Sequence, residues 1–243
     1  MITNLQSGTN VNEIGNGIFR VNTPIDIPAG RFSFNQYLVV DEQPLLFHTG
    51  PRKMFPLVRE AIEAVLRPER LRYIGLSHFE ADECGALNEF LAIAPGAEPL
   101  CGQIAAMVSV NDVADRPARP LGDGETLDLG KHTLRWFDTP HVPHAWECGL
   151  MMETVTRTFF CGDLFTQPGP GDAAVVESDI LESSEAFRHD MDYFAHAPST
   201  TDVLARLAAE RPTLLACMHG SAWRGDGGQL LQALSAALGA RSA

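Results

Sequence analysis

The sequence predicts an α/β fold in which two β-sheets pack together with helices on the outside. Each half of the 243-residue chain contains several short apolar, strand-like runs and then segments with helical periodicity. The composition, with 45% hydrophobic and 20% charged residues, is typical of a globular protein, and the length is ample for one large core. We therefore expect residues 1–243 to form a single domain.

The first half should supply one set of strands and helices. Pro56 at a first helical position and Pro68 after the last turn delimit one helix, and a second is expected from about Glu83 to Ile93. A strand and a helix should share residues 98–110. Apolar runs between turn-forming residues predict strands over Gly17–Val21, Phe34–Val40, Leu45–His48 and Leu71–Ser77.

The second half repeats this organisation. Ser183 or Ser184 is the expected cap of one helix, and two more helices should cover Thr201–Glu210 and Gln229–Leu238. The Pro- and Gly-rich loop Thr166–Asp172 is the best candidate for a mobile segment. Strands are predicted over Lys131–Asp138, Glu147–Glu153, Arg157–Cys161 and Thr213–Met218.

Charge and composition exclude several classes of function. The formal net charge of -13 argues against a nucleic-acid surface and against binding to an anionic membrane. No apolar run reaches the length of a membrane span, and the first residues lack the basic and apolar regions of a secretion signal. The five cysteines form no C-x-x-C pair, so we expect buried thiols rather than a zinc ribbon or disulfides. An acidic cytoplasmic protein is the expectation.

One segment concentrates groups that carry chemistry. Directly after the predicted strand Leu71–Ser77 come His78, Glu80, Asp82 and Glu83. In extended chain the first three would turn toward one side, because side chains alternate with a period of two. A helix N-terminus, with Asp82 as N-cap and Glu83 in the first turn, explains these two residues. It does not explain His78 or Glu80.

Similar side chains follow three other predicted strands. His141 and His144 follow the strand over residues 131–138, Asp163 follows the strand over 157–161, and His219 follows the strand over 213–218. Ligand sites gather beyond the carboxyl ends of strands in α/β folds. A single polar residue there is ordinary capping, but imidazoles and carboxylates at four strand ends favour a metal centre.

The number and type of donors favour two metal ions. Three imidazoles and three carboxylates, with Glu83 as a possible fourth carboxylate, are too many for one tetrahedral ion and imply a carboxylate bridge. An oxygen-rich set suits iron or manganese better than zinc, although zinc stays open as an alternative. The expected ligands are His78, Glu80, Asp82, His144, Asp163 and His219.

These residues resemble the metal-binding pattern of the metallo-β-lactamase superfamily, in the order His78-x-Glu80-x-Asp82, His144, Asp163, His219. Hydrolases of that superfamily usually carry a second histidine where Glu80 stands. The glutamate is similar to the flavodiiron branch, whose β-lactamase-like domain binds two irons and reduces oxygen or nitric oxide. The resemblance covers nearly the whole chain and implies a four-layer αββα sandwich.

The resemblance also implies a role for each position. Glu83 stands where the family commonly has histidine, so it would ligate, bind a metal-bound water or point away, and it is a candidate catalytic residue. His141, three residues before His144, is the other candidate: from its place in the sequence it would support a ligand, line the access path or lie in a solvated loop. His48 replaces a family aspartate, and we expect it to pack or to support a ligand. The resemblance implies that His78, Glu80 and His144 bind one iron and that Asp82 and His219 bind the other. Asp163 would bridge the two irons.

The resemblance stops short of the flavin module. Flavodiiron proteins attach a flavodoxin-like domain that delivers electrons, whereas this chain ends soon after its last predicted helix and has no rubredoxin-type cysteine pairs. The segment Gly169–Ala174 is a poor dinucleotide loop, because Pro170 removes an amide. We therefore expect a stand-alone diiron domain without flavin.

Two functions remain open. The first is binding or reduction of O2, or of NO, with a separate electron donor for an enzyme or a signalling partner for a sensor. The second is hydrolysis of an ester, lactone or phosphoester by metal-activated water, which Glu80 disfavours. A homodimer is compatible with both.

Overall fold

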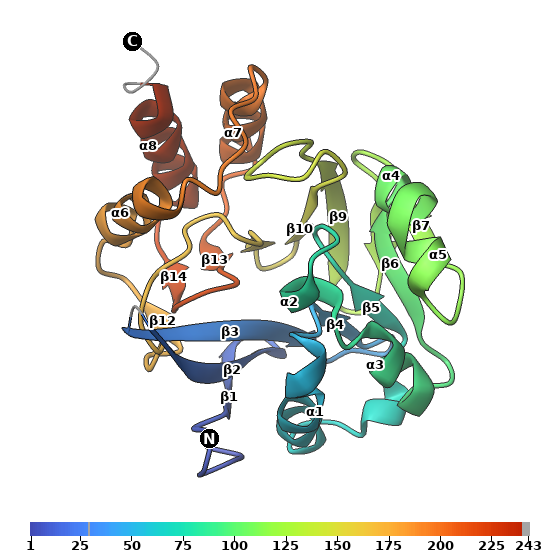
Figure 1. Cartoon of the computed structure of the whole chain (residues 1–243). Helices are drawn as coiled ribbons and strands as arrows, with labels where there is room; N and C mark the ends of the chain where they lie inside the picture. The colour runs from blue at the N-terminus through green and yellow to red at the C-terminus, as the bar shows by residue number, and fades with distance from the viewer. Residues whose placement is uncertain (29, 240–243) are drawn as a thin grey trace.

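Two seven-stranded sheets pack face to face in the computed structural model, which describes residues 1–28 and 30–239 (Figure 1). Helices cover the outer face of each sheet. The predicted four-layer αββα arrangement is therefore confirmed.

The first sheet is antiparallel from β1 to β4 and parallel from β4 to β7. Its strands, in spatial order, are β1 (Asn10–Gly15), β2 (Ile18–Ile27), β3 (Gly30–Val39), β4 (Leu45–Phe47), β5 (Tyr73–Gly75), β6 (Glu98–Gly102) and β7 (Arg119–Leu121). The helices of this half are α1 (Phe55–Glu63), α2 (Ala81–Cys84), α3 (Leu87–Ile93), α4 (Gln103–Ala105) and α5 (Asn111–Val113), with a π-helical turn over Ala106–Val110.

The second sheet is mixed: β11 pairs with β13 in parallel, and so does β12 with β14. Its strands, in spatial order, are β12 (Val175–Val176), β14 (Ala222–Arg224), β13 (Leu214–Ala216), β11 (Thr158–Phe160), β10 (Gly149–Glu153), β9 (Thr133–Asp138) and β8 (Thr126–Asp128). The helices are α6 (Leu181–Met191), α7 (Thr200–Ala209) and α8 (Gly227–Gly239).

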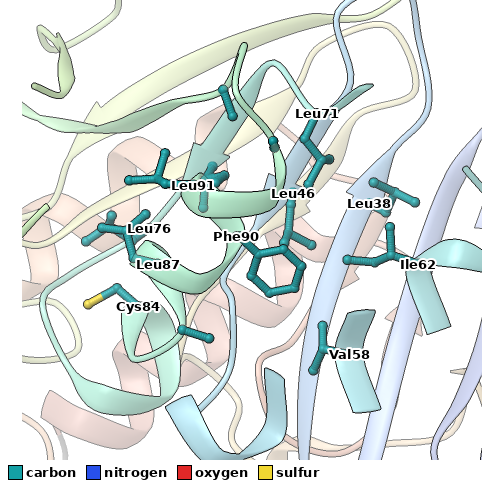
Figure 2. Close-up of a cluster of buried hydrophobic side chains, with 14 of the residues drawn as sticks. Leu38, Leu46, Val58, Ile62, Leu71, Leu76, Cys84, Leu87, Phe90 and Leu91 are labelled. Carbon is teal, nitrogen blue, oxygen red and sulfur yellow. The ribbon is translucent and has the colours of Figure 1, made fainter. Parts of the chain in front are cut away.

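Strand residues alternate between two cores, because successive side chains point to opposite faces. In β4, Leu45 and Phe47 pack between the sheets, whereas Leu46 lies under the helices with Ile62 of α1 and Phe90 of α3 (Figure 2). In the second sheet, too, one set of side chains packs under the helices and the other packs between the sheets. Both faces of each sheet are thus buried, which explains why the strands read as apolar runs.

The predicted helix from Glu83 to Ile93 is wrong in one respect: it is two helices, α2 and α3. The chain leaves α2 after Gly85. There the Ala86 amide donates to the Gly50 carbonyl at 3.2 Å and to Thr49 Oγ1 at 3.1 Å. The N-cap is the extended Glu80 rather than Asp82, which lies in the first turn. Contacts from a distant loop, invisible in local sequence, therefore decide this break.

The cap of α6 is also different from the one predicted. The helix begins at Leu181, before Ser183 and Ser184, and the Asp179 carboxylate accepts from the amides of Leu181 and Glu182 at 3.3 and 3.1 Å. Five short strands escaped prediction as well. These are β1, β7, β8, β12 and β14.

Two expectations from composition can be compared with the structure. All five cysteines are free and buried, as predicted. Within residues 1–28 and 30–239, none of the helices has both the length and the apolar character needed to cross a membrane.

Candidate metal centre

Imidazoles and carboxylates from both sheets meet at the carboxyl ends of the central strands. His78 follows β5, Asp163 follows β11 and His219 follows β13, and His144 lies on the long loop after β9. The donor atoms of His78, His144 and Asp163 lie within 4.8 Å of one another. The structure thus gathers side chains that are far apart in sequence into one cluster, as the strand-end pattern predicted.

One group of donors, called here the first half-site, consists of His78, Glu80, His144 and Asp163 Oδ2. The Nε2 atoms of the two histidines are 2.9 Å apart. Asp163 Oδ2 lies 3.5 Å from His78 Nε2 and 3.3 Å from His144 Nε2, and Glu80 Oε1 lies 3.4 Å from His144 Nε2. Four donors from three segments therefore surround one point.

A second half-site lies on the other side of Asp163. His219 Nε2 is 3.3 Å from Asp163 Oδ1 and 3.5 Å from Asp82 Oδ2. Asp163 therefore presents one oxygen to each half-site, which is the geometry of a bridging carboxylate. Oδ1 is buried and has no hydrogen-bond partner among the described residues. A cation would satisfy such an orphaned anionic oxygen.

The protein holds two of the histidines in the tautomer that metal ligation needs. His144 Nδ1 lies 2.9 Å from the Tyr193 carbonyl, and His219 Nδ1 lies 2.9 Å from the Ser33 carbonyl. A carbonyl only accepts, so Nδ1 carries the proton and the Nε2 lone pair faces the cluster. Supporting partners of this kind are typical of histidines that bind metals.

The charges of the metal-free cluster are unbalanced. Burial alone would raise the pKa of Asp163, but His219, whose Nε2 lies 3.3 Å from Oδ1, and the nearby His78 hold it well below its usual range. Burial would lower the pKa of His219, yet Asp163 and Asp82 raise it to about 9. In the metal-free cluster a second proton, on His219 Nε2, would take the place of the positive charge that a metal ion supplies.

Glu83 is fully buried, and it lies in the first turn of α2 as expected. Neither carboxylate oxygen has a hydrogen-bond partner among the described residues, and Oε2 lies 3.7 Å from His78 Nε2. Burial, followed by the charges of Asp163 and Asp82, raises the pKa of Glu83 well above its ordinary value. The carboxylate lies near the first half-site, since one of its oxygens is within 4.8 Å of donor atoms of His78 and Glu80.

His141 and His48 have different surroundings. His141 is exposed on the loop that carries His144, and its amide donates to the Ala145 carbonyl at 2.8 Å. The structure does not bring its side chain into the cluster. His48 is buried beneath the cluster and contacts Ser77 and Met218, each of which directly precedes a histidine of the site.

Polar residues of β2 and β3 hold the loop that carries His219, and sequence reasoning missed them. Tyr37 Oη donates to the Cys217 carbonyl at 2.6 Å. Asn35 Nδ2 donates to the carbonyls of Cys217 and Gly220, at 2.8 and 2.7 Å, and Arg20 Nη2 donates to the Gly220 carbonyl at 2.6 Å. Their only sequence signal was the presence of polar residues within otherwise apolar strands.

Aromatic rings form a wall beside the second half-site and reach the first. The Phe32 ring lies 4.5 Å from the His219 ring and stacks on Phe187 at 5.6 Å. The Tyr193 ring lies 5.9 Å from the His144 ring, and its hydroxyl donates to the Asp163 carbonyl at 3.0 Å. These rings limit the access of water on that side of the cluster.

Comparisons with known proteins agree on one family. A family model described as ODP family beta lactamase matches residues 32–220. The rubredoxin-oxygen oxidoreductase of Megalodesulfovibrio gigas is 28% identical over 206 residues, covering 79% of this chain and 50% of that protein. The anaerobic nitric oxide reductase flavorubredoxin of Pectobacterium atrosepticum is 27% identical over 210 residues, covering 82% and 40%. The chain thus spans half or less of these relatives.

Solved structures share the fold at lower identity. The Flv1 flavodiiron core from Synechocystis sp. PCC6803 superimposes with a TM-score of 0.84 at 20% identity, over 97% of this chain and 62% of that one. The flavodiiron protein from Giardia intestinalis gives a TM-score of 0.80 at 19% identity, over 94% and 59%. The two-sheet architecture is therefore that of the β-lactamase-like core in these proteins.

Proposed function

This chain belongs to the ODP beta-lactamase family, and from that premise we propose that it is a non-haem diiron protein that binds or reduces O2, with NO as the alternative ligand. The observation that carries the proposal is the division of Asp163, with Oδ2 facing one set of donors and Oδ1 the other. The names of the relatives, an oxygen oxidoreductase and a nitric oxide reductase, support the choice of ligand.

The proposal assigns each candidate ligand to one ion. When bound, two ferrous ions would supply one electron each to a diatomic ligand held between them. The mixed oxygen and nitrogen donors and the absence of thiolate favour iron, with manganese or zinc as alternatives. His78, Glu80 and His144 would hold the first ion, Asp82 and His219 the second, and Asp163 would bridge them.

The chain's own residues then do the rest. The backbone carbonyls at Tyr193 and Ser33 keep Nε2 of His144 and His219 free for a metal. Phe32 and Tyr193 restrict water near the cluster. We assign Glu83 to direct or water-mediated contact with an ion, because both of its buried oxygens lack partners among the described residues. We propose a catalytic role for His141 from the exposed loop that also carries His144.

Electrons are proposed to come from a separate donor. The flavin and rubredoxin functions in the relatives' names belong to proteins of which this chain spans half or less. We propose that residues 1–243 form the diiron domain alone and bind no flavin. Reduction of O2 and reversible O2 sensing would use the same centre, so turnover with an artificial donor distinguishes an enzyme from a sensor.

The surroundings of the protein are part of the proposal. Five free, buried cysteines and a net charge of -13 fit a cytoplasmic protein that binds neither nucleic acid nor membrane. A homodimer is proposed as the assembly, which analytical ultracentrifugation tests directly.

Metal analysis of protein purified without oxygen tests the proposed function. We expect about two irons per chain, little zinc, and a change in the absorption spectrum when air is admitted. Protein that holds two zinc ions and hydrolyses an ester or lactone, while its iron form is inert toward O2, would overturn the proposal in favour of a metallohydrolase.

A further inference from the structure

His48 occupies an unusual backbone position beneath the metal centre. It follows β4 with a φ of 66°, in the left-handed region that non-glycine residues rarely adopt. Its side chain is 1% exposed and stacks on the Phe47 ring at 4.3 Å. A polar ring in a strained and buried position persists only where its surroundings hold it there.

The imidazole is linked to a candidate ligand through one hydroxyl. His48 Nε2 lies 3.0 Å from Ser77 Oγ, and Ser77 Oγ lies 3.0 Å from His78 Nδ1. On its other side, His48 Nδ1 lies 3.0 Å from Met218 Sδ. The ring therefore sits between the residue that precedes His78 and the residue that precedes His219.

The partners of His48 determine where its proton lies. The Ser77 backbone amide, which only donates, points at His48 Nε2 at 3.3 Å, and the Met218 thioether only accepts. Nε2 is therefore the acceptor and Nδ1 the donor, in a neutral ring. Burial keeps the ring neutral, because it lowers the pKa of His48 to about 3.

The direction of the remaining hydrogen bonds follows from that assignment. Since His48 Nε2 accepts, the Ser77 hydroxyl donates to it and its oxygen accepts from His78 Nδ1. His78 then carries its proton on Nδ1 and presents the Nε2 lone pair to the cluster. The opposite order would place a proton on His78 Nε2, where Asp163 and His144 gather, and would prevent ligation.

Space around Ser77 limits its hydroxyl to this arrangement. Gly162, which precedes Asp163, has a φ of 50°, and a Cβ on it would lie 3.2 Å from Ser77 Oγ and 3.4 Å from Ser77 Cβ. The hydroxyl is thus confined between the turn at Gly162 and the ring of His48. Gly162, which is next to Asp163, and His48, which follows β4, thus hold the Ser77 hydroxyl from both sheets.

We propose that His48 is a positioning residue that fixes the tautomer and ring orientation of His78 through Ser77. The inference rests on the proposed function only in taking His78 as a metal ligand; it does not depend on which metal binds or on reaction with O2. Such supporting partners typically change metal affinity about 10- to 100-fold when removed.

Metal titration of variants tests the relay. His48→Leu removes the acceptor and Ser77→Ala removes the link, so each should weaken binding of one of the two metal equivalents by about 10- to 100-fold. The double variant should be no weaker than the worse single variant, because both changes break one chain of hydrogen bonds. His48→Gln, which keeps an acceptor at the end of its side chain, should bind within a few-fold of the wild type.

The control and the readouts separate positioning from general damage. His132 is a buried histidine that forms hydrogen bonds with Asp41 and with the Asn16 carbonyl. None of these residues is a candidate ligand, so His132→Leu should lower stability without lowering metal affinity. Titration with Fe2+ and with Zn2+, using a competing chelator, keeps the result independent of redox function. In the Co2+-substituted protein, the exchangeable ring N–H signal of His78 should be displaced in Ser77→Ala and retained in His132→Leu.

Three results would overturn the proposal. Unchanged affinity in both His48→Leu and Ser77→Ala would show that the contacts do not position His78. Losses that add in the double variant would mean that the two residues act separately. An equal loss in His132→Leu would reduce His48 to a residue that merely stabilises the fold.

Discussion

Asp163 is the residue on which both half-sites depend, because its two oxygens face different histidines. Asp163→Asn replaces one carboxylate oxygen by an amide nitrogen that cannot coordinate a metal, and it removes the bridging charge. We expect bound metal to fall from about two ions per chain to fewer than one, measured by elemental analysis after gel filtration.

The matched control for this change is Asp41, an aspartate whose side chain is only 2% exposed. Asp41 accepts from the amides of Lys131 and His132, at 2.8 and 2.7 Å, on a loop that carries no candidate ligand. Asp41→Asn should lower stability but keep full metal content. If Asp163→Asn also keeps two metal ions, the bridging assignment fails.

Glu83 carries the clearest charge effect of a single side chain. Glu83→Gln keeps the volume but cannot supply the negative charge that Glu83 would carry beside a bound cation near His78, so the oxidised metal should be less stabilised. We expect the midpoint potential to rise by roughly 60 mV, the equivalent of a tenfold change in a one-electron equilibrium. Redox titration followed by absorption or by electron paramagnetic resonance measures it.

Glu153 supplies the control for Glu83, since it is buried and its oxygens accept from the amides of Val155 and Thr156. Glu153→Gln should leave the potential unchanged. Glu83→His, which inserts the family's common residue, should raise the potential too, because it also removes the charge. Unchanged potentials and metal content in both Glu83 variants would exclude any contact of Glu83 with the metals.

At the scale of elements, the strands that could be predicted are those whose two faces are both buried. β4, β5, β10 and β11 read as apolar runs because they lie between a helix layer and the opposite sheet. Four of the five strands missed, β1, β7, β8 and β12, lie at the end of a sheet, where burial is weaker. The pairing of β7 and β12 depends on partners that are distant in sequence.

The site, too, could be predicted from the sequence only in part. Its six candidate ligands were visible as imidazoles and carboxylates at strand ends, and the structure gathers them. The groups that orient them, such as the Ser33 and Tyr193 carbonyls, were not visible, because any residue type offers a carbonyl. Only the fold places a particular carbonyl beside a particular ring.

Helix α2 is positioned by a close approach that only glycine allows. A Cβ on Gly85 would lie 2.9 Å from the Arg52 amide nitrogen and 2.2 Å from the Ala81 carbonyl oxygen. Gly85→Ala should therefore shift α2, which carries Asp82 and Glu83, and destabilise the protein by about 1–3 kcal/mol. We also expect weaker binding of the metal held by Asp82, measured by titration beside urea unfolding.

Gly96 provides the comparison for this element. A Cβ at Gly96 meets no atom within 4 Å, so Gly96→Ala should leave the free energy of unfolding nearly unchanged and metal binding intact. Similar behaviour of the two alanine variants would mean that α2 tolerates the displacement, and that its position does not depend on Gly85.

At the scale of the whole molecule, the candidate metal ligands come from both sheets. The first half of the chain supplies His78, Glu80 and Asp82, while the second supplies His144, Asp163 and His219. Without metal, the carboxyl groups of Glu80, Asp82, Glu83 and Asp163 crowd that junction, and burial together with their mutual repulsion raises the pKa of Glu83 well above its ordinary value. Bound cations would link the sheets and remove the repulsion at the same time.

Metal should therefore stabilise the entire fold and not only the loops of the site. A ligand present at a thousand times its Kd stabilises the native state by about 4 kcal/mol, which for a protein of this size raises Tm by roughly 10 °C. Calorimetry of chelator-treated and metal-loaded protein measures the difference. Hydrogen exchange should slow together in the segments after β5, β11 and β13, because they come from both sheets.

Asp163→Asn should show little response to added metal, whereas Asp41→Asn should respond as the wild type does. A Tm that does not depend on metal in the wild type would mean that the sheets are already joined without it, and that the clustered carboxylates do not bind cations tightly.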